Sequence, residues 1–246
     1  MANNFDKNWT TVNNNYPLND KEVERYISVK PSANQLALVD KPFYTFMHFG
    51  MNTATDREWG AGVEKATDFT IKSINAKQWV ETAKSAGATG VILTCKHHDG
   101  FCLWPSEYTS FCVKNSSYKG DIVKEVSDEC HNQGMDFGVY LSPWDMHDER
   151  YGTDAYNDYF CNQLTELLTN YGEIFEVWFD GAKGSNAKKF EYDWQRYYDL
   201  IRKLQPKANI AICGPDIRWV GNEGGKSRKS EYSVVPCALR EADRIM

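Results

Sequence analysis

The sequence lacks both a long hydrophobic run and an excess of positive charge. None of its apolar stretches approaches the roughly 18 residues that a membrane-spanning helix needs. Asp and Glu together number 34 against 28 Lys and Arg, which gives a net charge of −6. Affinity for nucleic acid depends on clustered Lys and Arg side chains. The composition therefore argues against both a membrane partner and a nucleic-acid partner.

Paired cysteine motifs are also missing. The seven cysteines are scattered, with no Cys-x-x-Cys pair and no His-x-x-x-His spacing. Neither a disulfide scaffold nor a structural zinc site is expected from such a pattern. Residues 1–20 lack the apolar core of a signal peptide. The odd cysteine count and this polar start favour a cytoplasmic location, or a secreted or periplasmic one if a signal peptide has been removed.

Aromatic side chains are what the sequence has in surplus. Trp, Tyr and Phe make up 14% of the 246 residues, whereas the hydrophobic and charged fractions, 41% and 25%, are ordinary for a globular chain. The length suits one large domain or two small ones. Some of the rings belong in a core, and the surplus also suits stacking against sugar rings.

Short apolar runs recur along the chain, each with the length and the two-sided apolar character of a buried parallel strand. They are Phe43–Gly50, Gly90–His98, Asp136–Ser142, Ile174–Asp180, Asn209–Cys213 and Ser233–Leu239. Amphipathic helices are predicted at Val23–Val29, Ala76–Ala86, Asp121–Asn132, Tyr156–Tyr171 and Trp194–Leu204. This alternation predicts a parallel α/β fold, either a doubly wound sheet or a (β/α) TIM-like barrel. No Gly-x-Gly-x-x-Gly or P-loop follows the first strand, which counts against a nucleotide-binding sheet.

The number of predicted strands falls short of a complete barrel, which has eight. Only six are visible by Leu239. We therefore expect an irregular barrel over residues 41–246, incomplete at its C-terminus, behind an N-terminal extension at 1–40. An open parallel sheet leaves unpaired N–H and C=O groups at its edge. We expect that edge to be covered by the extension, by a missing domain or by self-association with another copy.

Reactive side chains lie at the carboxyl ends of four successive predicted strands. In a (β/α) barrel the active site forms at these carboxyl ends. The residues found there are His48, the pair His97 and His98, Tyr140 and Asp180. Packing alone would be satisfied by Val or Leu at such positions. The set therefore predicts a site whose hydrogen-bonding groups surround a polyhydroxylated ligand.

The His97-His98-Asp99 segment also permits interpretation as a metal site. Adjacent residues on a strand point to opposite faces, so the two imidazoles would share an ion only if His48 or Asp180 joined them. No His-x-His or His-Glu-x-x-His motif supports that arrangement. We therefore expect no metal.

Asp180 is the leading candidate for a catalytic carboxylate, since it ends a rigid strand among aromatic residues. The alternative is a loop aspartate that caps a helix before Gly181. Glycoside hydrolysis needs two carboxyl groups, and the second should come from a loop above another strand. The candidates for it are Glu58, Asp99, Asp145, Asp216 and Glu223, of which Glu223 lies in the glycine-rich stretch Trp219–Gly225.

The motifs around these residues resemble the α-L-fucosidases of glycoside hydrolase family 29. The resemblance rests on His48–Asn52, Glu58–Gly60, Lys96–Trp104, Gly138–Asp145 and Trp178–Gly181, and it extends from about residue 42 to 239. It implies an irregular (β/α) barrel, which in the family is usually followed by a C-terminal β-sandwich; we expect residues 41–246 to form the barrel without that sandwich. It further implies retaining hydrolysis of terminal α-L-fucose without a cofactor.

The resemblance also assigns roles to residues of this sequence. Asp180 corresponds to the nucleophile and Glu223 to the acid/base. The residues implied to hold the fucose hydroxyls and line the pocket are His48, Glu58, Trp59, His97, His98 and Tyr140. The stretch around Arg218, a further binding residue, resembles the branch that prefers α-1,3 and α-1,4 linkages. The implied partner is a fucosylated, Lewis-type oligosaccharide or glycoconjugate. The main alternative is a fucose-binding protein that has lost turnover, because the chain is short for the family.

Overall fold

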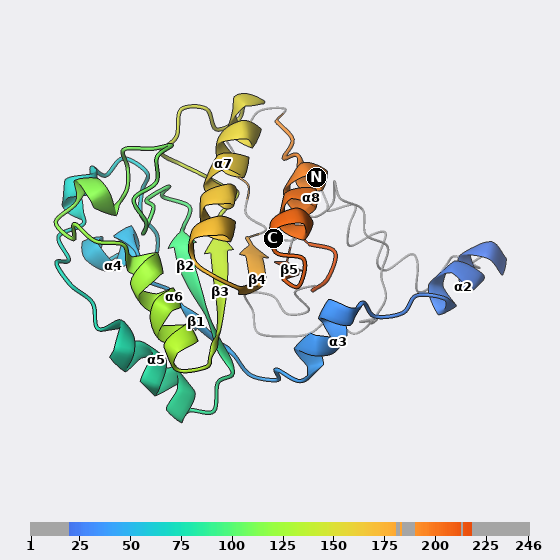
Figure 1. The fold of residues 1–246 in the computed structure, drawn as a ribbon. Coiled ribbons are helices and arrows are strands. Elements are labelled where there is room, and N and C mark those ends of the chain that lie inside the picture. The colour runs from blue at the N-terminus through green and yellow to red at the C-terminus, as the bar shows by residue number, and fades with distance from the viewer. Residues whose placement is uncertain (1–19, 181–182, 184–189, 213, 218–246) are drawn as a thin grey trace.

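The computed structural model describes residues 20–180, 183, 190–212 and 214–217. Their sheet has five parallel strands in the order β1-β2-β3-β4-β5 (Figure 1). The strands are β1 Thr45–Met47, β2 Gly90–Lys96, β3 Asp136–Leu141, β4 Ile174–Phe179 and β5 Asn209–Ile212. Each lies within one of the predicted runs, so the prediction of a parallel α/β fold is confirmed. The sixth predicted strand, Ser233–Leu239, lies outside the described residues.

The helices between the strands lie on one side of this sheet (Figure 1). They are α5 Ala76–Ser85, α6 Ile122–Asn132, α7 Ala155–Asn170 and α8 Trp194–Leu204. Three shorter helices come earlier, namely α2 Asp20–Ile27, α3 Ala33–Val39 and α4 Met51–Thr55, and single 3₁₀ turns occupy Ala66–Asp68 and Val113–Asn115. A doubly wound sheet reverses its strand order and carries helices on both faces. The described strands and helices do not have that arrangement.

Side-chain caps fix where three of these helices begin. Asn75, Asp121 and Asp193 each accept a hydrogen bond from the backbone N–H three residues later, at the first turns of α5, α6 and α8. Such a cap satisfies one of the N–H groups that a helix start leaves without a partner. Gly134, with φ of +67°, follows the end of α6, in the left-handed conformation that glycine adopts without strain.

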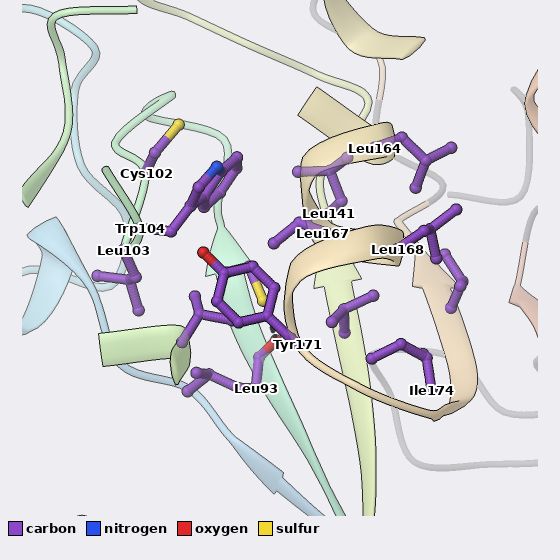
Figure 2. Close-up of a cluster of buried hydrophobic side chains, with 14 of the residues drawn as sticks. Leu93, Cys102, Leu103, Trp104, Leu141, Leu164, Leu167, Leu168, Tyr171 and Ile174 are labelled. Carbon is purple, nitrogen blue, oxygen red and sulfur yellow. Dashed lines mark hydrogen bonds between the residues drawn. The ribbon is translucent and has the colours of Figure 1, made fainter. Parts of the chain in front are cut away.

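The core lies between the sheet and its helices. Leu93 from β2 and Leu141 from β3 belong to the same hydrophobic cluster as Leu164, Leu167 and Leu168 of α7, and all five are essentially buried (Figure 2). The two-sided burial of β2, in which every residue is buried, shows that the other face of the sheet is covered as well. This explains why the strands read as continuous apolar runs rather than as alternating ones.

The sheet is strongly curved, and its concave face carries aromatic rings. The ring centroids of Phe46 in β1 and Trp178 in β4 lie 4.9 Å apart, and those of Tyr44 and Phe175 lie 5.3 Å apart. In a flat sheet, strands spaced about 4.8 Å apart would put the first and fourth about 14 Å from each other. Contact between these rings therefore requires the sheet to curl around its inner face.

Helix α3 closes the amino ends of the strands and is not among the predicted helices. The side chain of Asn34 donates to the carbonyls of Pro206 and Ala208, just before β5, and Asn209 donates back to the Asn34 carbonyl. Leu38 packs against the inner cluster of Ile92, Tyr140 and Phe175. The sequence signal for α3 is the capping box between Ser32 and Gln35. This part of the predicted extension is thus packed against the sheet.

No helix in the described part of the chain is long and apolar enough to cross a membrane.

The five cysteines that the structure describes are buried free thiols, namely Cys95, Cys102, Cys112, Cys130 and Cys161. Burial raises the pKa of the Cys95 and Cys102 thiols well above its usual range, so these groups stay protonated and unreactive.

Candidate active site

The predicted strand-end residues meet in one cluster. Tyr140 in β3 donates a hydrogen bond from its hydroxyl to Asp180 Oδ2, just past β4, at 2.7 Å. His98 Nε2, beyond β2, lies 3.8 Å from the same oxygen. The His97 ring lies 4.1 Å from that of His98, centroid to centroid, and is stacked on Tyr140 at 5.6 Å. Three strands thus bring four polar side chains together at the carboxyl edge of the sheet.

The two histidines share one side because β2 ends before them. Lys96, the last strand residue, points toward the helices, where its Nζ lies 3.0 Å from both Asp145 Oδ2 and Gln163 Oε1. Beyond it the backbone leaves the extended conformation, so the alternation of a strand no longer applies. The prediction that His97 and His98 would point to opposite sides was therefore wrong.

His48 joins the cluster from the end of β1. Its ring centroid lies 4.5 Å from that of His97. The segment is held by the Thr94 hydroxyl, which accepts from the Phe49 N–H at 3.0 Å and donates to the Phe49 carbonyl at 2.9 Å. This double contact attaches the chain after β1 to the middle of β2. It fixes the backbone on which His48 stands.

Trp59 stands at the rim of the cluster, and Glu58 precedes it. The Trp59 ring lies 5.7 Å from that of His98, with an edge-to-face orientation, and keeps 46% of its surface exposed. Glu58 is exposed as well. Gly60 follows, and a Cβ there would come within 2.5 Å of the Asp99 Cβ. The close packing of Gly60 on Asp99 therefore places the Glu58–Trp59 segment beside the histidines.

Burial keeps the imidazoles of the cluster neutral. It lowers the pKa of His97 to about 3, helped by the neighbouring His98 and His48 and opposed by Asp180. Burial, with His48, also lowers the pKa of His98 to about 4. Burial and the Asp180 charge raise the pKa of the Tyr140 hydroxyl well above its usual range. Near neutral pH the cluster thus offers one phenolic donor and neutral rings, each with one donor and one acceptor.

Three of the other carboxylates considered for catalysis, Asp145, Asp216 and Asp99, have structural roles. Asp145 is paired with Lys96, and both side chains are fully buried. Asp216 forms an ion pair with Arg202 at 2.5 Å and accepts from the Ile210 N–H. Asp99 accepts from the Phe101 N–H at 2.8 Å, and burial raises its pKa to about 7. Glu223 and Arg218 lie outside the described residues, so the structure does not test them.

The comparison with known proteins agrees with this geometry. A family model described as α-L-fucosidase matches residues 51–235. The chain belongs to this family. It is 49% identical over 209 residues to α-L-fucosidase 1 of Arabidopsis thaliana, which covers 83% of this chain and 41% of the plant protein. Plasma α-L-fucosidase of Homo sapiens matches less of the chain, at 34% identity over 48% of this chain and 27% of the human protein.

Solved structures of the α-L-fucosidase family have the same fold. A glycoside hydrolase 29 family member from a rumen bacterium superposes with a TM-score of 0.79, at 44% identity, over 86% of this chain and 43% of its own. A Ruminococcus gnavus family-29 fucosidase solved in complex with fucose gives 0.75 at 37% identity, over 83% and 48%. The chain spans about two fifths of the length of the curated plant relatives it matches.

Side chains that the sequence prediction missed complete the cluster. Ser142 Oγ lies 2.7 Å from His98 Nδ1, and the Trp144 ring lies 4.8 Å from that of His98. Trp178 stacks on Tyr140 at 5.4 Å. All three lie inside the motifs that carry the family resemblance. The sequence signal that could have identified Ser142 and Trp144 as site residues was their position within three residues of the end of β3.

One group in the described part of the chain has the composition and spacing of a metal site. His97, His98 and Asp180 each offer a ligand atom, and these atoms lie within 4.8 Å of one another. Neutral imidazoles and a carboxylate are also the groups that hold sugar hydroxyls. The arrangement alone is compatible with both uses.

Proposed function

We propose that this chain carries the catalytic site of an α-L-fucosidase and releases terminal α-L-fucose from glycans. The observation that supports this most is the Asp180 carboxylate, held by Tyr140 at 2.7 Å and bordered by neutral His98. Its side chain is 17% exposed, so an incoming ligand can reach it. Membership of the family supports the same activity.

The proposed mechanism retains the configuration at the anomeric carbon through two displacements. Asp180 attacks that carbon and forms a glycosyl–enzyme ester, while Glu223 protonates the departing glycosidic oxygen. Glu223 then removes a proton from water, whose oxygen attacks the anomeric carbon and releases Asp180 as a carboxylate. Tyr140 keeps its proton in this setting and orients Asp180 through the 2.7 Å hydrogen bond.

The remaining cluster residues are proposed to bind the sugar. His48, His97 and His98 offer donors and acceptors for fucose hydroxyls, with Glu58 beside them. The exposed Trp59 ring and Tyr140 provide apolar faces for the C5 methyl group and the sugar ring. Arg218 is proposed to contribute from the acceptor side. No metal or cofactor takes part in the proposed reaction.

The scaffold is proposed to be an irregular (β/α) barrel over residues 41–246. The sequential strand order, the helices on one side and the contact of Phe46 with Trp178 across the concave face support it. The preferred substrates are proposed to be α-1,3- and α-1,4-linked fucose on branched, Lewis-type oligosaccharides. The support for this preference is the resemblance of the Pro215–Gly225 stretch to that branch of the family.

The test of the activity is hydrolysis of a Lewis-type trisaccharide by the full chain. Asp180→Asn should lower kcat/KM by at least about 10³-fold, since the attacking oxygen is lost. The matched control, Asp158→Asn, removes an exposed carboxylate of α7 and should leave the rate unchanged. Wild-type turnover by Asp180→Asn would exclude Asp180 as the nucleophile.

The linkage preference needs a separate assay. The chain is incubated with α-1,2-, α-1,3-, α-1,4- and α-1,6-fucosides of matched size, and released fucose is quantified. The proposal requires faster release from the α-1,3 and α-1,4 linkages. A higher rate on the α-1,2-fucoside would contradict it while leaving the fucosidase activity itself intact.

A further inference from the structure

Hydrogen-bond accounting fixes the position of one proton in the cluster. Ser142 is fully buried, and its Oγ lies 2.7 Å from the Trp144 carbonyl oxygen. A carbonyl oxygen only accepts, so the single hydroxyl hydrogen of Ser142 must point at it. The same Oγ lies 2.7 Å from His98 Nδ1. Because its hydrogen is already used, Oγ accepts there and Nδ1 must carry the proton.

The ring of His98 cannot escape this constraint by turning. It is 95% buried, since its relative exposure is 5%. Its neighbours are the rings of His97 at 4.1 Å, Trp144 at 4.8 Å and Trp59 at 5.7 Å, centroid to centroid. A flipped ring would place a C–H group against Ser142 Oγ and lose the 2.7 Å hydrogen bond. The packing therefore holds both the orientation and the tautomer.

We infer that Ser142 is a positioning residue that keeps His98 in the Nδ1–H tautomer, so that Nε2 accepts a hydrogen bond from a hydroxyl of the substrate. A neutral imidazole protonated at Nδ1 has only a lone pair at Nε2. The nearest charged oxygen, Asp180 Oδ2, is an acceptor as well, and at 3.8 Å the two atoms are too far apart for a hydrogen bond. A ligand that satisfies Nε2 must donate to it.

The inference rests on the proposed function in one respect, namely that the donor is a hydroxyl of fucose. The tautomer itself follows from the protein alone. If His98 carried its proton on Nε2 instead, that N–H would face Asp180 and be drawn into an ion-pair-like contact with the nucleophile. By holding the Nδ1–H tautomer, Ser142 keeps Nε2 able to accept a hydrogen bond. It also keeps an Nε2–H group from lowering the nucleophilicity of the Asp180 carboxylate.

The protein part is tested by ¹⁵N NMR of the imidazole nitrogens in histidine-labelled full chain. The His98 signals are assigned by their loss in His98→Gln. We expect Nδ1 to show the shift of a protonated nitrogen and Nε2 that of a bare one at pH 7. In Ser142→Ala the two should move toward the opposite tautomer. Ser127→Ala, which removes a fully buried helical hydroxyl of α6, should leave them unchanged.

A protonated Nε2 in the wild-type chain would overturn the inference, and so would identical His98 shifts in Ser142→Ala. If Ser142→Ala does not fold, Ser142→Thr keeps the hydroxyl and the wild-type spectrum still decides. A structural role alone would lower thermal stability in Ser142→Ala without moving the tautomer.

The substrate part is tested with fucosides in which one hydroxyl at a time is replaced by fluorine, which cannot donate. One of these replacements should lower kcat/KM of the wild-type chain by about tenfold, the loss of one hydrogen bond. The same replacement should cost Ser142→Ala much less. Equal losses in both proteins would refute the link to the substrate. Absence of turnover on every fucoside, with the Nδ1–H signal present, would refute the proposed function and leave the tautomer assignment standing.

Discussion

Two polar clusters lie on opposite sides of the same strand end, and they differ in how completely their groups are paired. On the helix side, Lys96 contacts Asp145, Gln163 and Tyr156, and every partner is within 3.3 Å. On the concave side, His97 leaves its Nδ1 without a hydrogen-bond partner, and His98 Nε2 stands 3.8 Å from Asp180. The first cluster has no capacity left for a ligand, whereas the second does.

Burial and charge alone therefore do not mark an active site. Both clusters are buried, both contain ionisable groups, and their residues are adjacent in the sequence. Asp145 is only 1% exposed, yet its oxygens are taken by Lys96 and by the N–H groups of His147 and Asp148. Unused hydrogen-bonding capacity beside an accessible carboxylate is the feature that distinguishes the concave cluster.

The largest effect on stability is expected from a substitution at Lys96. Lys96→Met should lower the free energy of unfolding by about 3–5 kcal/mol, because Asp145 is left buried without its cation. Urea unfolding at pH 7 measures the change. Lys207→Met is the matched control, since its pair with Glu173 is exposed on both sides and should contribute less than about 1 kcal/mol. Equal losses in the two variants would show that the Lys96 cluster is not the structural one.

Glu176 of β4 is a second buried carboxylate, and like the concave cluster it has polar atoms without hydrogen-bond partners. Burial raises its pKa to about 7; the Tyr44 hydroxyl opposes this, although neither Glu176 oxygen makes a standard hydrogen bond. A raised carboxyl pKa favours the fold below pH 4.5, and that contribution is lost as pH rises through 7.

The free energy of unfolding of Glu176→Gln should therefore rise relative to that of the wild type between pH 4.5 and pH 8. The expected rise is roughly 2–3 kcal/mol. Thermal unfolding across this range measures it, with fucosidase activity as the second readout. A variant whose stability follows the wild type at every pH would show that Glu176 is ionised without cost.

The His97→Phe variant should separate function from stability. It keeps a ring in contact with Tyr140 and removes the unpartnered Nδ1, so the free energy of unfolding at pH 7 should stay within about 1–2 kcal/mol of the wild type. Because its pKa is lowered to about 3, His97 favours the fold above pH 6.5 and loses that contribution as pH falls toward 3. The free energy of unfolding of His97→Phe should therefore rise relative to that of the wild type as the pH falls below 6.5.

Fucose binding by His97→Phe, measured by calorimetry, should weaken at least about tenfold, as expected for a lost hydrogen bond to the sugar. Large destabilisation together with unchanged binding would place His97 among the structural residues beside Lys96.

The smallest effect is expected at Trp59, whose ring is half exposed. Trp59→Ala should change the free energy of unfolding by less than about 1 kcal/mol and weaken fucose binding by a similar amount, which is about fivefold. Tyr108→Ala removes an exposed ring of comparable accessibility outside the cluster and should leave binding unchanged. If both variants bind equally well, the aromatic rim does not contact the sugar.

Strands β2 to β5 were predictable from sequence because nearly all of their residues are buried, so β2 and β3 read as apolar runs. Helix α3 was missed, because its seven residues carry a weak periodicity and only the Ser32 capping box marks its start. The relation of His97 to His98 was misjudged, since no local pattern shows that β2 stops at Lys96. Ser142 was missed because its role appears only when the ends of β2 and β3 meet in space. Glu223 and Arg218 remain predictions.

The most direct test of the account is to trap the proposed intermediate on Asp180. The full chain is incubated with a 2-deoxy-2-fluoro-fucosyl fluoride, whose fluorine slows hydrolysis of the ester, and its peptides are analysed by mass spectrometry. We expect a 2-deoxy-2-fluoro-fucosyl adduct on the peptide that contains Asp180, and no adduct in Asp180→Asn. An adduct on another carboxylate, or inversion of configuration at the released fucose, would contradict it.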